Sequence, residues 1–188
     1  MTSTAIFAEI LVVGLQATVW LGLLCLWIAG VNGIPVGSIG ARLCGLKEWA
    51  TLIATFVLGL AYTLGIVVDR LADSIQSSIE KRLSTKRKPS VSVAVKRLRV
   101  MKDAPEITKF LEYIRSRMRI ARSTSLNLLM TTFAAALLAR HRGFWILLII
   151  GTGLALVVLS TYVSRRIART YDKRLSQAYD IVESAKTS

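Results

Sequence analysis

The chain has 188 residues, a length that suggests a single domain. Its mean hydropathy of +0.53 is too high for a soluble protein of this size, and its net charge of +14 comes from basic residues clustered between apolar runs. Two cysteines and one histidine are too few for a disulfide framework or a zinc cluster, so we expect an all-α integral membrane protein without a cofactor.

The first apolar run, Ala5–Ala29, contains 25 residues and is long enough to cross a bilayer as a retained helix. Its one charged residue, Glu9, lies about one turn from the start. The simplest interpretation places Glu9 at the membrane interface, where the N-terminal end of the helix dipole stabilises an acid. The alternative is an ion pair with Arg70, Arg122 or Arg165 on another helix.

Glycines and a proline then predict an irregular segment, Gly30–Leu46, which we expect to be an outer loop rather than a re-entrant pore loop. Cys25 and Cys44 are expected to remain thiols, although an oxidising outer compartment would allow a disulfide. The second apolar run, Trp49–Val68, has 20 residues, and its helical pattern continues into solvent. This continuity predicts one helix over Lys47–Leu83.

The pattern changes over Ser84–Lys102, where valines alternate with other residues, which predicts a short strand or, more simply, an extended connector. The next helix starts at Asp103-Ala-Pro-Glu, with Asp103 as the capping candidate. That helix can continue into a third span, Ser123–Ala139, which has 17 residues and several polar side chains. After a tight turn, Phe144–Val163 forms the fourth span, and its helical stripe continues almost to the C-terminus.

Three apolar stripes therefore extend from spans two, three and four into solvent, and we expect them to pack together as a cytoplasmic helical bundle. The stripes are Val68, Leu71, Ala72, Ile75, Ile79 and Leu83; Ile107, Phe110, Leu111, Ile114, Met118 and Ala121; and Val163, Ile167, Tyr171, Leu175, Ala178 and Val182. The chain then divides into the first two spans with their outer loop (1–69), a basic cytoplasmic hairpin (70–122), the last two spans (123–164) and a cytoplasmic C-terminal helix (165–188).

The distribution of basic residues predicts the orientation. If the chain crosses four times, 21 Lys and Arg residues lie on the side of the termini and four lie on the other side. The positive-inside rule then places both termini and the basic hairpin in the cytoplasm, with the protein in the inner, or plasma, membrane. Trp27, Trp49 and Trp145 fall at the predicted outer ends of their helices, as an aromatic belt would.

Several polar residues lie in the inner half of the apolar runs, and we treat them as one intramembrane polar layer. The layer consists of Glu9, Gln16, Tyr62, Asn127 and Thr131. We expect these residues to form hydrogen bonds between helices, because membrane-embedded helices commonly associate in this way. A wet constriction in an oligomeric pore is the alternative.

The basic residues of the hairpin and the C-terminal helix fall into two groups. Those close to the membrane are expected to contact lipid headgroups: Arg70, Arg115, Arg117, Arg119, Arg122, Arg165 and Arg166. Those farther out are expected to bind an anionic partner, which could be a soluble cytoplasmic protein, a nucleotide or a nucleic acid: Lys86, Arg87, Lys88, Lys96, Arg97 and Arg99.

The sequence contains no catalytic motif, so we do not expect an enzyme. Its plan is analogous, at the level of architecture alone, to small bacterial multispanning proteins that act as membrane sensors or effectors, including those of antiphage defence. We expect a homo-oligomer whose basic bundle binds an anionic ligand or partner and transmits that event to the spans. An ion or solute channel is the second hypothesis, and a membrane-bound enzyme with an unrecognised site is the third.

Overall fold

The computed structural model describes residues 3–29, 49–83, 93–141 and 143–187. Every regular element in these ranges is a helix, which confirms the all-α prediction for this part of the chain. The helices are α1 (Ser3–Ile28), α3 (Ala50–Leu83), α4 (Val93–Asp103), α5 (Pro105–Leu138) and α6 (Gly143–Thr187). The long helices predicted over Lys47–Leu83 and from Asp103 through the third apolar run correspond to α3 and α5.

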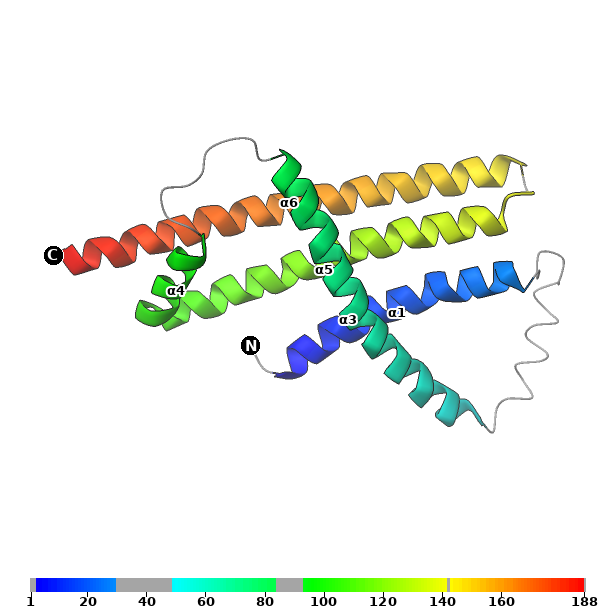
Figure 1. Ribbon diagram of the computed structural model, residues 1–188, viewed down its shortest axis with the longest axis horizontal. Coiled ribbons are helices and arrows are strands. Elements are labelled where there is room, and N and C mark those ends of the chain that lie inside the picture. The colour runs from blue at the N-terminus through cyan, green and yellow to red at the C-terminus, as the bar shows by residue number, and fades with distance from the viewer. Residues whose placement is uncertain (1–2, 30–48, 84–92, 142, 188) are drawn as a thin grey trace.

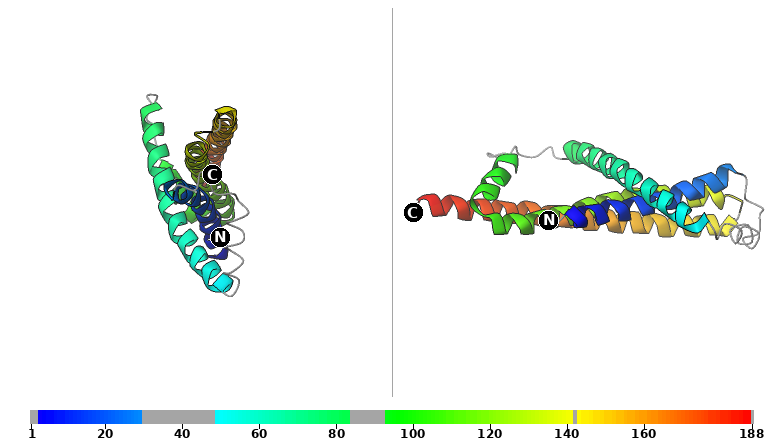
Figure 2. Two further views of the ribbon diagram at one scale, coloured as in Figure 1. Left: turned by 90° about the vertical axis from the view of Figure 1, so that its right-hand side faces the viewer. Right: turned by 90° about the horizontal axis from the view of Figure 1, so that it is seen from below.

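Helices α1, α5 and α6 lie side by side, and α3 crosses them obliquely (Figures 1 and 2). Helix α5 is central, because it contacts α1, α3, α4 and α6. The end of α1, the start of α3 and the start of α6 lie toward one end of the molecule, whereas α1 begins near its middle and α6 ends at the other end (Figure 1). The three tryptophans at those helix ends therefore share one end of the molecule.

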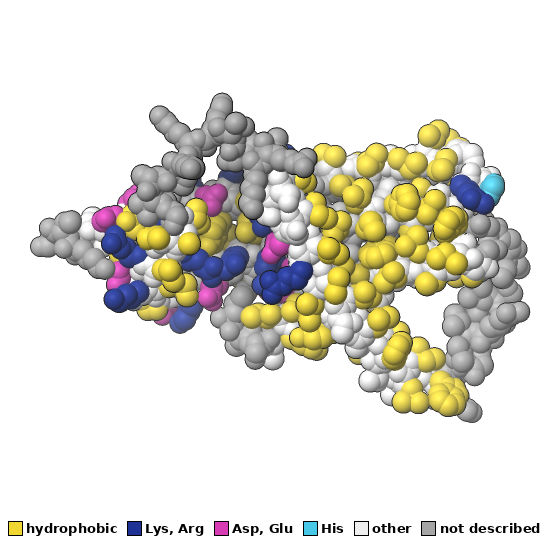
Figure 3. Space-filling view, viewed as in Figure 1, with side chains coloured by type: hydrophobic (Ala, Val, Ile, Leu, Met, Phe, Trp, Pro, Cys, Tyr) yellow, Lys and Arg dark blue, Asp and Glu magenta, His cyan; other side chains and the backbone are white. Residues whose placement is uncertain are grey.

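Three of the described helices contain stretches that are long and apolar enough to cross a membrane: Ile6–Ile28, Ala50–Ile79 and Gly143–Ser184. Hydrophobic side chains accordingly cover the half of the molecule toward the α5–α6 turn, whereas acidic and basic side chains gather around α4 and its neighbours (Figure 3). The second half of α5 is less apolar and does not meet the same criterion. It packs against both α1 and α6.

Glycines allow α1 and α3 to approach closely. A Cβ atom at Gly14 would overlap the backbone of Ala61, and one at Gly65 would overlap the backbone of Ile10. Van der Waals contact between backbones is one of the main sources of helix association in lipid, where apolar side chains gain nothing by leaving the lipid. Gly14 and Gly65 therefore fix the crossing of α1 and α3 within one chain.

A hydrophobic core joins α4 to the charged halves of α5 and α6. Its buried members are Val100, Leu111, Ile114, Tyr171, Leu175, Ala178 and Tyr179. The stripes predicted on α5 and α6 therefore meet each other. The stripe of α3 does not join them, because Leu71, Ile75 and Ile79 remain 51%, 47% and 44% exposed. The expectation that all three extensions pack together is wrong for α3, whose place in this core is taken by α4.

The strand or extended connector predicted over Ser84–Lys102 is also wrong where the structure describes it, because α4 begins at Val93. Val100 is fully buried against α5 and α6, so tertiary packing overrides the local alternation of valines. Asp103 is the last residue of α4 rather than the cap of α5. The N-cap of α5 is Ala104, which makes no side-chain cap hydrogen bond, and Pro105 occupies the first turn as predicted.

Candidate functional site

An ion-pair network lies where the apolar half of the molecule meets the charged half, and it links three helices. It consists of Glu9 from α1, Asp69 and Asp73 from α3, and Ser116, Arg119, Arg122 and Ser123 from α5. The spacing of three and four residues places the α5 members along one side of that helix, and the two acids of α3 lie one turn apart.

At the centre of the network, two carboxylates from different helices share one guanidinium group. Arg119 Nη2 lies 3.5 Å from Glu9 Oε2, and Arg119 Nε lies 3.9 Å from Asp69 Oδ2. The side chains of Glu9 and Asp69 are only 14% and 19% exposed, so this pairing is partly shielded from solvent. Ser116 donates a hydrogen bond to Glu9, and Ser123 Oγ donates one to Asp69 Oδ1 over 3.2 Å.

The interhelical ion pair considered for Glu9 is therefore present, but its partner was wrong. Arg119 occupies the position for which Arg70, Arg122 and Arg165 were the candidates. Arg122 instead pairs with Asp73, with Nη1 and Oδ1 3.4 Å apart, and its side chain is only 14% exposed. A second link between α3 and α5 thus lies one turn from the first.

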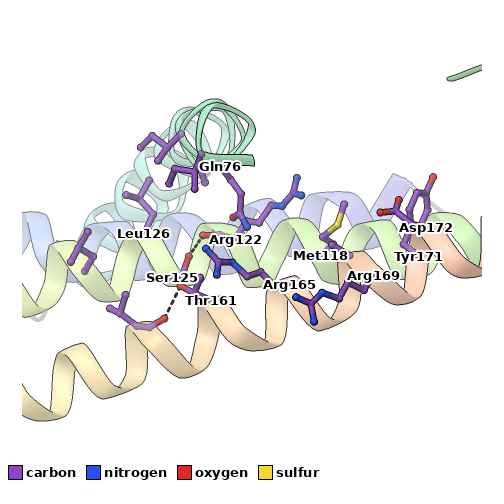
Figure 4. Close-up of a pocket in the computed structure, with 16 residues that line it drawn as sticks. Gln76, Met118, Arg122, Ser125, Leu126, Thr161, Arg165, Arg169, Tyr171 and Asp172 are labelled. Atoms are coloured by element: carbon purple, nitrogen blue, oxygen red, sulfur yellow. Dashed lines mark hydrogen bonds between the residues drawn. The ribbon is translucent and has the colours of Figure 1, made fainter. Parts of the chain in front are cut away.

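A groove of about 800 Å³ lies beside the network, between α3 on one side and α5 and α6 on the other. Arg122, Arg165 and Arg169 line its charged end, and all three are labelled in Figure 4. Leu129 and Val157 line its apolar end. Ile75 and Ile79 of the α3 stripe line the facing wall, outside the α4–α5–α6 core.

Two members of the polar layer bond to each other, as expected. The Asn127 amide, 2% exposed, donates to the Val13 carbonyl over 3.0 Å and to Gln16 Oε1 over 3.3 Å. Trp20 Nε1 donates to Asn127 Oδ1 over 3.1 Å, and Thr124 donates to Gln16 over 3.2 Å. These bonds join α1 to α5.

The other three members of the layer lie elsewhere. Glu9 belongs to the ion-pair network. The Tyr62 ring stacks on Phe7, with ring centroids 5.1 Å apart. Thr131 is half-buried on α5, one turn beyond Asn127, and no hydrogen bond joins it to the described members of the layer. The single layer predicted from depth alone is thus three separate sets of contacts.

The basic residues predicted to bind an anionic partner are divided by the structure. Lys86, Arg87 and Lys88 lie outside the described residues. Two residues of α4 tie that helix to α6: Lys96 Nζ lies 3.5 Å from Ser176 Oγ, and Arg99 Nη1 lies 2.9 Å from Tyr179 Oη and 3.3 Å from Glu183 Oε1. Arg97 lines a small pocket between α4 and α5 together with Arg115.

The arginines predicted to contact lipid headgroups fall into two groups, one exposed and one within the network or the groove. Arg70, Arg115, Arg117 and Arg166 are exposed, and the Arg117 guanidinium lies 4.7 Å from the centre of the Tyr113 ring. Arg119 and Arg122 have carboxylate partners inside the network, and Arg165 lines the groove.

Sequence reasoning did not select Asp69, Asp73, Ser116 or Ser123 as site residues. The available signal was the pair of acids one turn apart at the charged end of a span, where topology favours basic residues. Within the described residues, no group of three or more His, Cys, Asp and Glu side chains could hold a metal ion. The arrangement instead suits electrostatic binding and the joining of helices.

No protein-family model matches the chain, and no curated protein or solved structure matches it. The geometry of the network and the groove is therefore the basis on which a function can be inferred.

Proposed function

We propose that the protein is a non-enzymatic, oligomeric membrane protein that binds an anionic ligand at its cytoplasmic side and couples binding to its spans. The observation that carries this proposal is the position of Arg122. Its guanidinium group pairs with Asp73 of α3, and its side chain also lines the groove. An anion in the groove would compete with Asp73 for the same positive charge.

Such competition would weaken the attachment of α3 to α5. A charge-assisted hydrogen bond contributes about 1.5–3 kcal/mol, and a ligand can shift a conformational equilibrium only by its differential affinity for the two states. Helices α5 and α6 run without interruption from the charged end into the apolar half. A change at Arg122 would therefore be transmitted along continuous helices.

The proposed topology has four crossings, with the second half of α5 as the third. If α3 and α6 both cross, the chain leaves α3 on the side of the termini and enters α6 on the opposite side, so α5 must return it across the membrane. Its polar side chains suit a position between α1 and α6 rather than one facing lipid. The excess of basic residues then places both termini in the cytoplasm.

Two glycines support self-association. A Cβ atom at Gly59 or Gly151 would meet nothing within 4 Å, so these small surfaces have no partner among the described residues. None of the residues in the most apolar window of α6 is buried. We propose that Gly59 and Gly151 contribute to contacts between copies, since small residues allow helices to approach closely in lipid.

A conducting pore is less well supported. Two of the residues that suggested a wet constriction, Gln16 and Asn127, bond to each other, and Asn127 also bonds to the Val13 carbonyl, so they leave fewer polar groups for a shared channel.

The coupling can be tested without knowing the ligand. In a cysteine-free background, spin labels at Ser78 of α3 and Arg166 of α6 report the separation of these helices. Asp73→Asn removes the charge that holds Arg122, so the distance distribution should broaden or shift to longer values. Asp180→Asn makes the same charge change on an exposed part of α6 and should have no effect. An unchanged distribution in Asp73→Asn would refute coupling through Arg122.

A further inference from the structure

The groove changes character along its length. On α5 its lining runs from Leu129 and Leu126 to Arg122, and seven residues of helix separate the first from the last by about 10 Å. On α6, which packs antiparallel to α5, the lining runs from Val157 through Thr161 to Arg165. Both helices therefore change from apolar to basic in the same direction.

The basic end has an excess of positive charge. Three arginines line it, and Asp172 is the only acidic residue among the lining side chains. Arg165 and Arg169 are exposed, and within the described part of the chain neither forms an ion pair. In Figure 4 they extend from α6, Arg122 extends from α5, and Gln76 lies across the groove on α3. An occupant of this end should carry negative charge.

Toward the spans, beyond Ser125 and Thr161, the lining is apolar and consists of Leu126, Leu129 and Val157, with Leu129 43% exposed. Ile75 and Ile79 of α3 add a half-exposed apolar wall across the groove, on the far side of Asp73 from the spans. A soluble anion would satisfy the arginines but leave this wall in contact with water. An apolar helix from a second copy would cover the wall but leave the arginines without a counter-charge. The gradient fits a molecule that is anionic at one end and apolar at the other.

We infer that the groove binds one molecule of an anionic phospholipid. Its phosphate contacts Arg122 and Arg165, with Arg169 nearby, and an acyl chain follows Leu126, Leu129 and Val157 toward the apolar half of the molecule. A volume of about 800 Å³ is within the range of small-molecule sites and accommodates a headgroup with the first part of a chain. This inference depends on the proposed function, since it identifies the ligand that competes with Asp73.

The test uses the full chain in detergent, with bound lipid counted by native mass spectrometry during titration with dioleoyl phosphatidylglycerol. Arg165→Gln combined with Arg169→Gln should weaken binding by about 25-fold, because each charge near a headgroup contributes roughly a factor of five. The matched control, Lys173→Gln combined with Arg174→Gln, removes two exposed charges from the same helix outside the groove and should change affinity little.

A second variant tests the apolar end. Leu129→Trp should obstruct the path of the chain and weaken phosphatidylglycerol binding, while binding of inorganic phosphate to the same variant should not change. Equal loss in the control pair would mean general surface attraction, and equal binding of dioleoyl phosphatidylcholine would mean no recognition of charge. Inorganic phosphate that binds the parent protein as tightly as phosphatidylglycerol would indicate a soluble anion. Each of these three results overturns the assignment of an anionic phospholipid.

The lipid assignment and the coupling through Arg122 can be refuted separately. If the groove variants bind phosphatidylglycerol normally but Asp73→Asn still alters the α3–α6 distance, coupling through Arg122 survives and the lipid assignment does not. If Asp73→Asn leaves the distance unchanged, the proposed function itself is refuted.

Discussion

Replacing Gly65 by alanine tests the packing of α1 on α3 with a single methyl group. The new Cβ atom would overlap the backbone of Ile10, and a backbone cannot move aside as a flexible side chain can. The two helices must therefore separate along their contact. Overpacking of this kind typically costs about 1–3 kcal/mol, and a clash with backbone places the expected loss near 3 kcal/mol. For a chain of this length, that corresponds to a decrease in Tm of roughly 6–12 °C.

Gly22→Ala provides the matched control, because it makes the same chemical change in α1, the other helix of the pair. A Cβ atom at Gly22 meets nothing within 4 Å, so this variant should be as stable as the parent or gain up to about 1 kcal/mol from helix propensity. Thermal unfolding in mild detergent, followed by circular dichroism and by the loss of the monodisperse peak, measures both. Equal Tm values for the two variants would refute the α1–α3 crossing described above.

Three further predictions concern other contacts. Asn127→Leu removes three hydrogen bonds of about 0.6 kcal/mol each and should lower stability by about 2 kcal/mol in the same thermal assay. Leu175→Ala should cost about 2–5 kcal/mol, because Leu175 is 2% exposed, whereas Ile181→Ala at a 62% exposed position should cost little. Arg119→Gln should destabilise more than the double variant with Glu9→Gln, since the single change leaves two partly buried acids, Glu9 and Asp69, without their shared cation, whereas the double variant leaves only Asp69; the opposite order would contradict the network.

Helix extents were largely predictable because they depend on local signals. Pro105 and Glu106 favour a helix start, and apolar spacing of three and four residues continues from there into the third apolar run. The strand or connector predicted where α4 lies was wrong because that prediction used local signals alone. Its valines alternate locally, but Val100 is buried against two helices that follow it in sequence, and such contacts are not visible in a short window.

Rotation about the helix axis was not predictable, and it determines most of the site. Gly59 and Gly65 both lie in small-residue motifs of α3, but six residues of helix separate them by about 240° around the axis. Only Gly65 contacts α1, whereas Gly59 faces open space. The partner of Glu9 depends on the same rotation. Sequence indicated an arginine at this depth, but the orientation of α5 against α1 selects Arg119.

The attachment of α3 supports the proposal that a ligand acts at the groove. At the level of the spans, Gly14 and Gly65 hold α3 against α1 by close backbone contact. At the boundary, Asp69 and Asp73 join it to α5. Beyond these acids its apolar side chains face the groove rather than a packed core, so this part of α3 has little to hold it in place. Arg122 is at this junction, so charge placed beside it acts on the pair with Asp73, the last ion pair between α3 and α5 along the described part of α3.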